Sequence, residues 1–142
     1  MIDGFNIRIY ALCVEENRLL VLHEPFMGNM VCKLPGGGLE FGEGTIDCLK
    51  REFMEELGLK IKNYSPYYIQ ENYVESLAKN NKQIVLLYFK VEIENASSIQ
   101  LLDANIQSYE WIDLKKDCPL TLPVDQIVYE KLKKESFFLK RQ

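Results

Sequence analysis

The sequence lacks several features that would assign a protein to a class at once. Its 142 residues include only one histidine, and its four cysteines form no CxxC or Cys/His pair, so we expect neither a zinc site nor a disulfide framework. No apolar run approaches the roughly 18–20 residues that a membrane span requires. No charged and then apolar segment of the kind typical of a secretion signal opens the chain. We therefore expect a cytoplasmic protein without a membrane partner.

Internal repeats, low-complexity tracts and linker-like segments are also missing from the sequence. At roughly 100–200 residues per domain, residues 1–142 are expected to form one domain. Hydrophobic residues make up 47% of the chain and charged residues 27%, which excludes the disordered, collagen-like and coiled-coil classes.

Basic residues are scarce in only one part of the chain. The 21 acidic and 17 basic residues give a net charge of -4, and residues 37–59, with six acidic and two basic side chains, account for all of it. Because nucleic-acid surfaces need clustered Lys and Arg, we expect no nucleic-acid partner. The carboxylates of this segment instead suit divalent cations, which would cancel the charge and allow a polyanion to bind.

Segments rich in β-branched and aromatic residues predict a sheet. The predicted strands are 5–14, 19–23, 67–73, 83–93 and 109–112. The stretch 24–30 contains Pro25 and Gly28 and is predicted to be a loop. From Pro123 to about Lys134 the pattern is helical, with apolar residues at helix spacing: Val124, Ile127, Val128 and Leu132. A mixed sheet with about two helices predicts an α/β or α+β fold.

A second helix is predicted over residues 46–57, directly after a glycine turn. Thr45 is a good N-cap residue, Asp47 suits the positive end of the helix dipole, and Gly58 is typical of a helix C-terminus. Apolar residues at helix spacing predict the buried stripe, which consists of Ile46, Leu49, Phe53 and Leu57.

Three carboxylates of this helix fall beside the buried stripe. At about 100° per residue, Glu52, Glu55 and Glu56 share a band about 100° wide. Like charges four residues apart destabilise an isolated helix by a few tenths of a kcal/mol, so a cation among them is expected. Clustered hard oxygen ligands favour Mg²⁺, with Mn²⁺ as an alternative. A solvated acidic face is the simpler interpretation, but the glycine turn, Glu43 and Arg51 at fixed distances from this helix disfavour it.

The same segment resembles the signature of the Nudix hydrolases. That signature is G, five residues, E, seven residues, then R-E-U-x-E-E-x-G-U, where U is a bulky apolar residue. Here Gly37 and Glu43 are followed by REFMEELGL over residues 51–59, so all nine specified positions within 23 residues are filled. The resemblance implies an α/β/α sandwich with a mixed sheet.

The resemblance also implies roles for individual residues. Glu52, Glu55 and Glu56 would bind the metal, together with the main-chain carbonyl of Gly37. Arg51 and Glu43 would hold the helix and the loop in register through an ion pair or hydrogen bonds. Catalysis is expected from Glu55, Glu56 and Arg51, with Glu55 or Glu56 acting on the attacking water.

The reaction that such a site supports is attack of water on a phosphorus of a diphosphate linkage. The resemblance implies a nucleoside diphosphate joined to another moiety, as in a nucleoside triphosphate, a nucleotide sugar, ADP-ribose or a dinucleotide. Substrate contacts are expected from Phe26, Tyr73 and Asp103, and the family resemblance makes a homodimer a further expectation.

Two other functions fit parts of the pattern. A non-catalytic Nudix-like domain could sense a nucleotide and regulate a partner, although such domains usually lose carboxylates that this sequence keeps. An isomerase of prenyl diphosphates would need additional Cys and Glu catalytic groups that the sequence does not place.

Overall fold

The computed structural model describes the backbone of residues 1–141 and the side chains of residues 1–137. Eight strands, two α-helices and one 3₁₀ turn make up the fold. The strands are β1 (Gly4–Glu15), β2 (Arg18–Phe26), β3 (Asn29–Lys33), β4 (Gly36–Gly38), β5 (Ile61–Ile69), β6 (Val74–Glu75), β7 (Lys82–Ile93) and β8 (Ser108–Asp113). The helices are α1 (Thr45–Leu57) and α2 (Pro123–Arg141), and the 3₁₀ turn is Ala96–Ser98.

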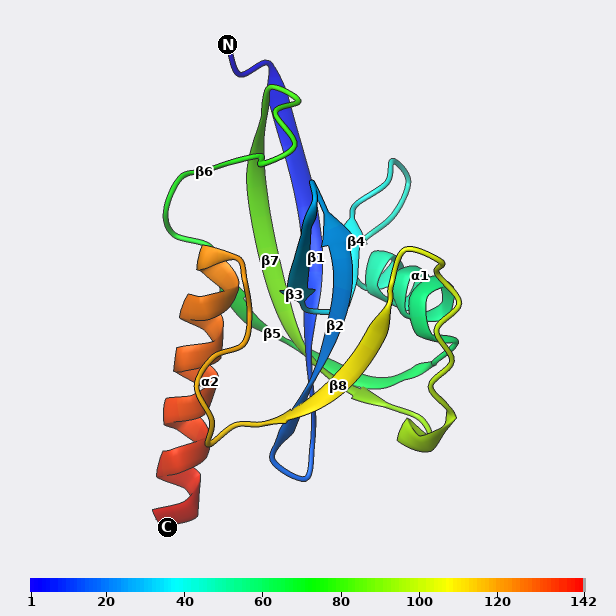
Figure 1. Ribbon diagram of the computed structural model, residues 1–142, viewed down its shortest axis with the longest axis vertical. Coiled ribbons are helices and arrows are strands. Elements are labelled where there is room, and N and C mark those ends of the chain that lie inside the picture. The colour runs from blue at the N-terminus through cyan, green and yellow to red at the C-terminus, as the bar shows by residue number, and fades with distance from the viewer. Residues whose placement is uncertain (142) are drawn as a thin grey trace.

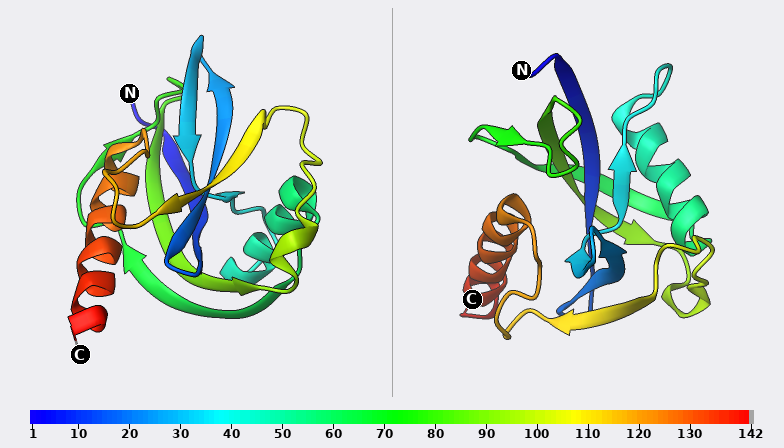
Figure 2. Two further views of the ribbon diagram at one scale, coloured as in Figure 1. Left: turned by 60° about the horizontal axis from the view of Figure 1, so that its bottom comes forward. Right: turned by 45° about the horizontal axis from the view of Figure 1, so that its top comes forward.

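The strands form one mixed sheet between the two helices. Its main order is β3-β2-β1-β7-β5, with β4 paired to β1, β6 to β7 and β8 to β2. The central pair, β1 and β7, is parallel, whereas the other pairs are antiparallel. Helix α1 lies on one side of the sheet and α2 on the other (Figures 1 and 2). This arrangement confirms the predicted α/β/α sandwich.

The central strand β1 carries apolar side chains on both faces because a helix covers each of them. Ile9 and Ala11 belong to the buried cluster that includes Leu49, Phe53 and Leu57 of α1. Tyr10 and Leu12, one residue out of step, belong to the cluster that includes Val124, Val128 and Leu132 of α2. The alternation along one strand therefore fixes both helices to opposite faces of the sheet.

Helix α1 confirms most of the predicted pattern and corrects its start. Leu49, Phe53 and Leu57 are fully buried, and the chain leaves the helix at Gly58 with φ 64°. The N-cap is Gly44 and not Thr45, because the Asp47 carboxylate accepts the Gly44 N–H at 2.9 Å and thereby closes the first turn one residue earlier.

The predicted loop over 24–30 is wrong, since these residues form a hairpin of β2 and β3. Pro25 lies within β2 opposite Met30. Met27 and Gly28 make the turn with φ of 50° and 84°. Two positive φ values give a turn whose twist matches that of the flanking strands, so strand pairing continues on either side of it.

Two further boundaries differ from the predictions. The strand predicted over 67–73 is β5, which runs from Ile61 to Ile69 and leaves Tyr73 outside it. Its first half is polar and exposed because it lies at the edge of the sheet, which hides the alternation that predicts strands. Helix α2 extends to Arg141, and Ile127 is 44% exposed although the pattern predicted it to be buried. None of the described helices is long and apolar enough to cross a membrane.

The two faces of α2 provide a test of this packing. Replacing Leu132, which is 5% exposed, by Ala should lower the free energy of unfolding by about 2–5 kcal/mol. The matched change Ile127→Ala should cost less than about 1 kcal/mol because that side chain is already partly in solvent. Chemical denaturation monitored by circular dichroism measures both. Equal losses would contradict the orientation of α2.

Candidate active site

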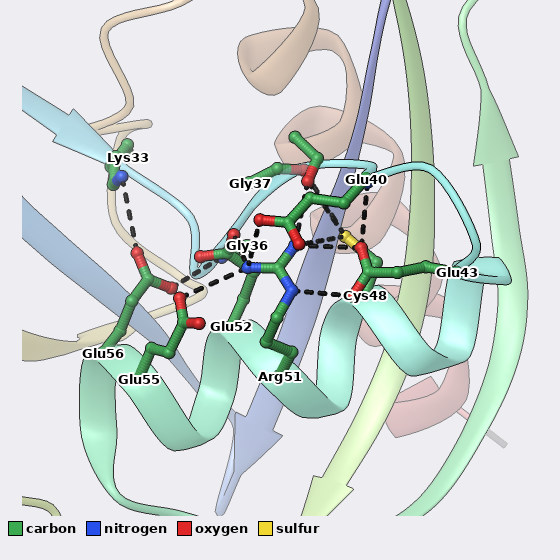
Figure 3. Close-up of polar contacts among 11 residues, drawn as sticks. Lys33, Gly36, Gly37, Glu40, Glu43, Cys48, Arg51, Glu52, Glu55 and Glu56 are labelled. Carbon is green, nitrogen blue, oxygen red and sulfur yellow. Dashed lines mark hydrogen bonds and ion pairs between the residues drawn. The ribbon is translucent and has the colours of Figure 1, made fainter.

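The acidic segment lies where a short glycine strand meets a helix. Residues Gly36–Gly38 of β4 pair with Arg8–Tyr10 of β1, so the glycines are held against the centre of the sheet. Helix α1 packs against β1 and β4. Its carboxylates therefore point along the flank of the helix toward the glycine strand (Figure 3).

The guanidinium of Arg51 connects the parts of this segment. It binds both oxygens of Glu43, with Nε–Oε2 2.6 Å and Nη2–Oε1 3.0 Å. Nη2 also donates to the Gly38 carbonyl at 3.0 Å. Nη1 donates to Glu52 at 2.9 Å and to Glu55 at 3.2 Å. The expected ion pair between Arg51 and Glu43 is thus present, and it links helix, loop and glycine strand.

Glu43 stays ionised far below neutral pH in this arrangement. The hydrogen bond from Arg51, supported by one from the Glu40 main chain at 2.9 Å, lowers the pKa of Glu43 to about 2. The hydrogen bond to Glu43 in turn raises the pKa of Arg51. The pair is therefore charged at neutral and at mildly acidic pH.

Glu52 lies directly against Gly37. A Cβ atom at position 37 would be 2.5 Å from Glu52 Oε1, so any residue larger than glycine would displace this carboxylate. Burial raises the pKa of Glu52, and the hydrogen bond and the charge of Arg51 oppose that rise. The main chain of Gly37 and the carboxylate of Glu52 therefore lie side by side.

Glu56 is the most deeply placed of the helix carboxylates, at 3% exposure. Its Oε1 accepts the Gly36 N–H at 3.0 Å, and its Oε2 lies 3.6 Å from Nζ of Lys33. Lys33 also pairs with Glu24 at 2.9 Å. Burial raises the pKa of Glu56 to about 7 even though Lys33 and the Gly36 N–H favour its ionised form. Glu55, in contrast, has a side chain that is 59% exposed.

The donor set of this region fits Mg²⁺ or Mn²⁺, because it consists of carboxylate oxygens with a main-chain carbonyl next to them. Within the described residues, no three His, Cys, Asp or Glu side chains already surround one point where a metal could bind. The reason is visible in Figure 3: Glu52 and Glu55 turn toward Arg51, while Glu56 turns toward Gly36.

Comparison with known proteins agrees with the motif and its geometry. The sequence matches the NUDIX domain family over residues 4–130, which is most of the chain. This protein belongs to the Nudix hydrolase family. The enzyme class expected from the sequence, a Nudix pyrophosphohydrolase, agrees with this membership.

Individual relatives are distant. An RNA pyrophosphohydrolase of Ruthia magnifica subsp. Calyptogena magnifica is 25% identical over 93% of this chain and 81% of its own. The crystal structure of a MutT Nudix hydrolase from Burkholderia pseudomallei has a TM-score of 0.74 at 19% identity, covering 90% of this chain and 97% of its own. The Nudix domain of Shewanella oneidensis NrtR, solved with ADP ribose, has a TM-score of 0.73 at 13% identity, covering 94% and 89%. The two solved structures support the fold alone.

Of the residues expected to contact substrate, Phe26 and Tyr73 lie outside the Nudix signature of residues 37–59 (the Nudix box), and Asp103 lies in a loop hydrogen-bonded to it. Phe26 ends β2 beside the hairpin turn and is 41% exposed, and Tyr73 precedes β6 and is 59% exposed. Asp103 accepts the N–H of Asn105 at 2.9 Å in a loop that the Leu102 N–H ties to the Glu56 carbonyl at 3.0 Å. Among described residues, no hydrogen bond or ion pair joins these three side chains to the box.

Two polar residues of the site, Glu24 and Lys33, are not among those that the sequence predicts. Glu24 belongs to the stretch 24–30 that the sequence predicts to be a loop, and Lys33 is a single cation between the apolar residues Cys32 and Leu34. A cation inside an apolar strand beside the glycine turn is the signal that could have identified Lys33. Its partners could not be identified, because Glu24 and Glu56 meet it only through strand pairing and helix packing.

The pKa of Glu43 predicts how stability depends on pH. Because this pKa is lowered from its ordinary 4.5 to about 2, the ionised carboxylate stabilises the fold above pH 4.5, and this contribution is lost as the pH falls through 2. Glu43→Gln should therefore be less stable than the wild type at pH 7, and the difference should shrink toward pH 3. Denaturation at several pH values measures it.

Glu130→Gln is the matched control, since Glu130 is exposed on α2 away from Arg51. It should change stability little at either pH. A deficit of Glu43→Gln that stays the same from pH 7 to pH 3 would show that the ion pair does not have the assigned role.

Proposed function

We propose that this Nudix protein is a Mg²⁺-dependent hydrolase of a diphosphate linkage in a nucleoside diphosphate joined to another moiety. Candidate substrates are a nucleoside triphosphate, a nucleotide sugar, ADP-ribose or a dinucleotide. The observation that carries the proposal is the complete box, in which Arg51 holds Glu52 and Glu55 beside the glycine strand while the Gly36 N–H holds Glu56.

The metal ligands in this proposal are Glu52, Glu55 and Glu56 together with the Gly37 carbonyl. When bound, Mg²⁺ (or Mn²⁺) supplies positive charge to the phosphate oxygens and lowers the pKa of a water. Glu52 and Glu56 are partly or fully shielded from solvent and are held by neighbouring groups. They therefore suit a fixed role as ligands, whereas the exposed Glu55 can also reach a solvent molecule.

Either Glu55 or Glu56 acts as the general base for the attacking water in this proposal. Glu56 is held beside the glycine strand by the Gly36 N–H at 3.0 Å, which would place its carboxylate next to a metal-bound water. Glu55 has the exposure that a carboxylate needs to contact incoming water. Arg51 acts by orienting both Glu55 and Glu52, so its contribution to catalysis is positional.

The relatives support a phosphate-anhydride substrate without selecting one. One is named an RNA pyrophosphohydrolase, and a protein of similar fold was solved with ADP ribose, which itself contains a diphosphate. Substrate binding by Phe26, Tyr73 and Asp103 belongs to the proposal. The cytoplasmic location and the homodimer rest only on the sequence and on the family resemblance.

The proposed activity is tested by a substrate panel with and without Mg²⁺. The panel contains nucleoside triphosphates, nucleotide sugars, ADP-ribose, dinucleotides and an RNA oligonucleotide with a 5′-triphosphate, and products are identified by mass spectrometry. At least one compound should be cleaved at a diphosphate linkage, EDTA should abolish the reaction and Mg²⁺ should restore it. A panel without metal-dependent product would contradict the hydrolase. Tight nucleotide binding without turnover would instead support the nucleotide-sensing alternative.

Substitutions of the Nudix-box carboxylates test whether these residues are responsible for that activity. Glu56→Gln and Glu55→Gln should each lower kcat by about 100-fold or more, because a lost metal ligand or base removes several kcal/mol of transition-state stabilisation. Glu40→Gln is the matched control, since Glu40 has a 66% exposed side chain only 3.7 Å from Arg51 and should keep most of the activity. Unchanged circular dichroism shows that the variants fold. Full activity in both box variants would refute the site assignment.

A further inference from the structure

A second arginine lies on the other face of the glycine strand. Arg8 belongs to β1 and is opposite Gly38 of β4. A Cβ atom at Gly38 would lie 3.5 Å from Nη1 of Arg8, whereas a Cβ atom at Gly37 would meet Glu52. Because successive residues of a strand point to opposite faces, Arg8 and Glu52 lie on either side of β4.

The guanidinium of Arg8 has hydrogen-bonding capacity that the described residues leave unused. Its Nε donates to the Tyr10 hydroxyl at 2.7 Å, and the group lies 5.5 Å from the centre of the Tyr10 ring. Within residues 1–137, no hydrogen bond or ion pair involves its two terminal nitrogens. No buried side-chain nitrogen or oxygen of that part lacks a partner, so these nitrogens reach solvent.

Arg8 differs from Arg51 in how many of its guanidinium nitrogens already have a hydrogen-bond partner. Arg51 uses Nε, Nη1 and Nη2 on carboxylates and on a carbonyl. Arg8 is anchored at Nε by Tyr10, and among the described residues its two terminal amino groups have no hydrogen bond or ion pair. A guanidinium fixed in this way presents parallel donors, which is the geometry that binds two oxygens of a phosphate.

We propose that Arg8 is a substrate-binding residue whose terminal nitrogens bind the oxygens of a substrate phosphate across β4 from the Glu52 carboxylate. The proposal rests on the proposed function and specifies the substrate further. The phosphate chain would extend past the glycine strand, with one phosphate beside the carboxylates and another against Arg8. At Gly38 a Cβ atom would be in ordinary van der Waals contact with Nη1 of Arg8, so the guanidinium lies directly against the glycine strand.

Binding without turnover tests the proposal independently of the activity. The probes are α,β-methylene-ADP, in which the bridging carbon resists hydrolysis, and inorganic pyrophosphate, which has no nucleoside. Titration calorimetry in Mg²⁺ should show that Arg8→Ala weakens both by roughly ten- to hundredfold, the loss expected for a charge-assisted hydrogen-bonded pair. With an identified substrate, KM should rise far more than kcat falls.

Three further variants separate phosphate binding from a structural role. Tyr10→Phe removes the partner that fixes Nε but leaves the charge, so it should weaken binding, but less than Arg8→Ala does. Arg18→Ala removes an exposed arginine that, among the described side chains, forms an ion pair only with Glu16 at 3.7 Å, and it should bind both probes as the wild type does. Arg8→Lys should recover part of the affinity because it restores the charge without the parallel donors.

Several outcomes would overturn the proposal. Wild-type affinity of Arg8→Ala for both probes would do so, as would a loss confined to α,β-methylene-ADP, which would assign Arg8 to the nucleoside. A wild-type protein that binds neither probe would also contradict the proposal. Normal binding by the wild type with the expected loss in Arg8→Ala, but without turnover of any panel compound, would instead refute only the hydrolase.

Discussion

The site depends on one guanidinium placed among carboxylates that would otherwise repel one another. Arg51 lies within 4 Å of Glu40, Glu43, Glu52 and Glu55, and four of its contacts are hydrogen bonds to carboxylate oxygens. An isolated surface ion pair contributes about 0–1 kcal/mol to stability. A bidentate arginine–carboxylate pair within a network of charges contributes more, because its geometry is fixed. The network keeps the acidic flank of α1 compact.

The remaining architecture brings this helix flank to a strand without side chains. Apolar residues on both faces of β1 hold α1 and α2 on opposite sides of the sheet. Pairing of β4 with β1 then places Gly37 where the carboxylate of Glu52 needs space. The net charge of -4 in residues 37–59 is therefore concentrated at one point of the fold, where the proposed cations would cancel it and attract phosphate.

Those parts of the fold and site that depend on local patterns could be predicted from the sequence. The buried stripe of α1, its end at Gly58 and the shared flank of its carboxylates all follow from helical periodicity, because one element contains every residue involved. The box could be recognised for the same reason, since its nine specified positions lie within 23 residues.

Features that depend on tertiary pairing could not be predicted. Pro25 and Gly28 favour a loop locally, but pairing of β2 with β3 makes them part of a hairpin. Lys33 and Arg8 are isolated cations in apolar strands, and their relation to the box arises only when β3 and β1 are placed beside it. Ile127 fits the helical stripe but lies at the edge of the α2 interface.

The claim that these carboxylates form a cation site that recruits a polyanion is tested most directly by Mn²⁺ binding. The electron paramagnetic resonance signal of free Mn²⁺ can be followed during titration of the wild type and of the Glu52→Gln/Glu56→Gln double variant, with and without α,β-methylene-ADP. The account predicts that the nucleotide analogue tightens Mn²⁺ binding to the wild type and that the double variant binds at least tenfold more weakly. Equal Mn²⁺ affinity of the two proteins, unaffected by the analogue, would contradict it.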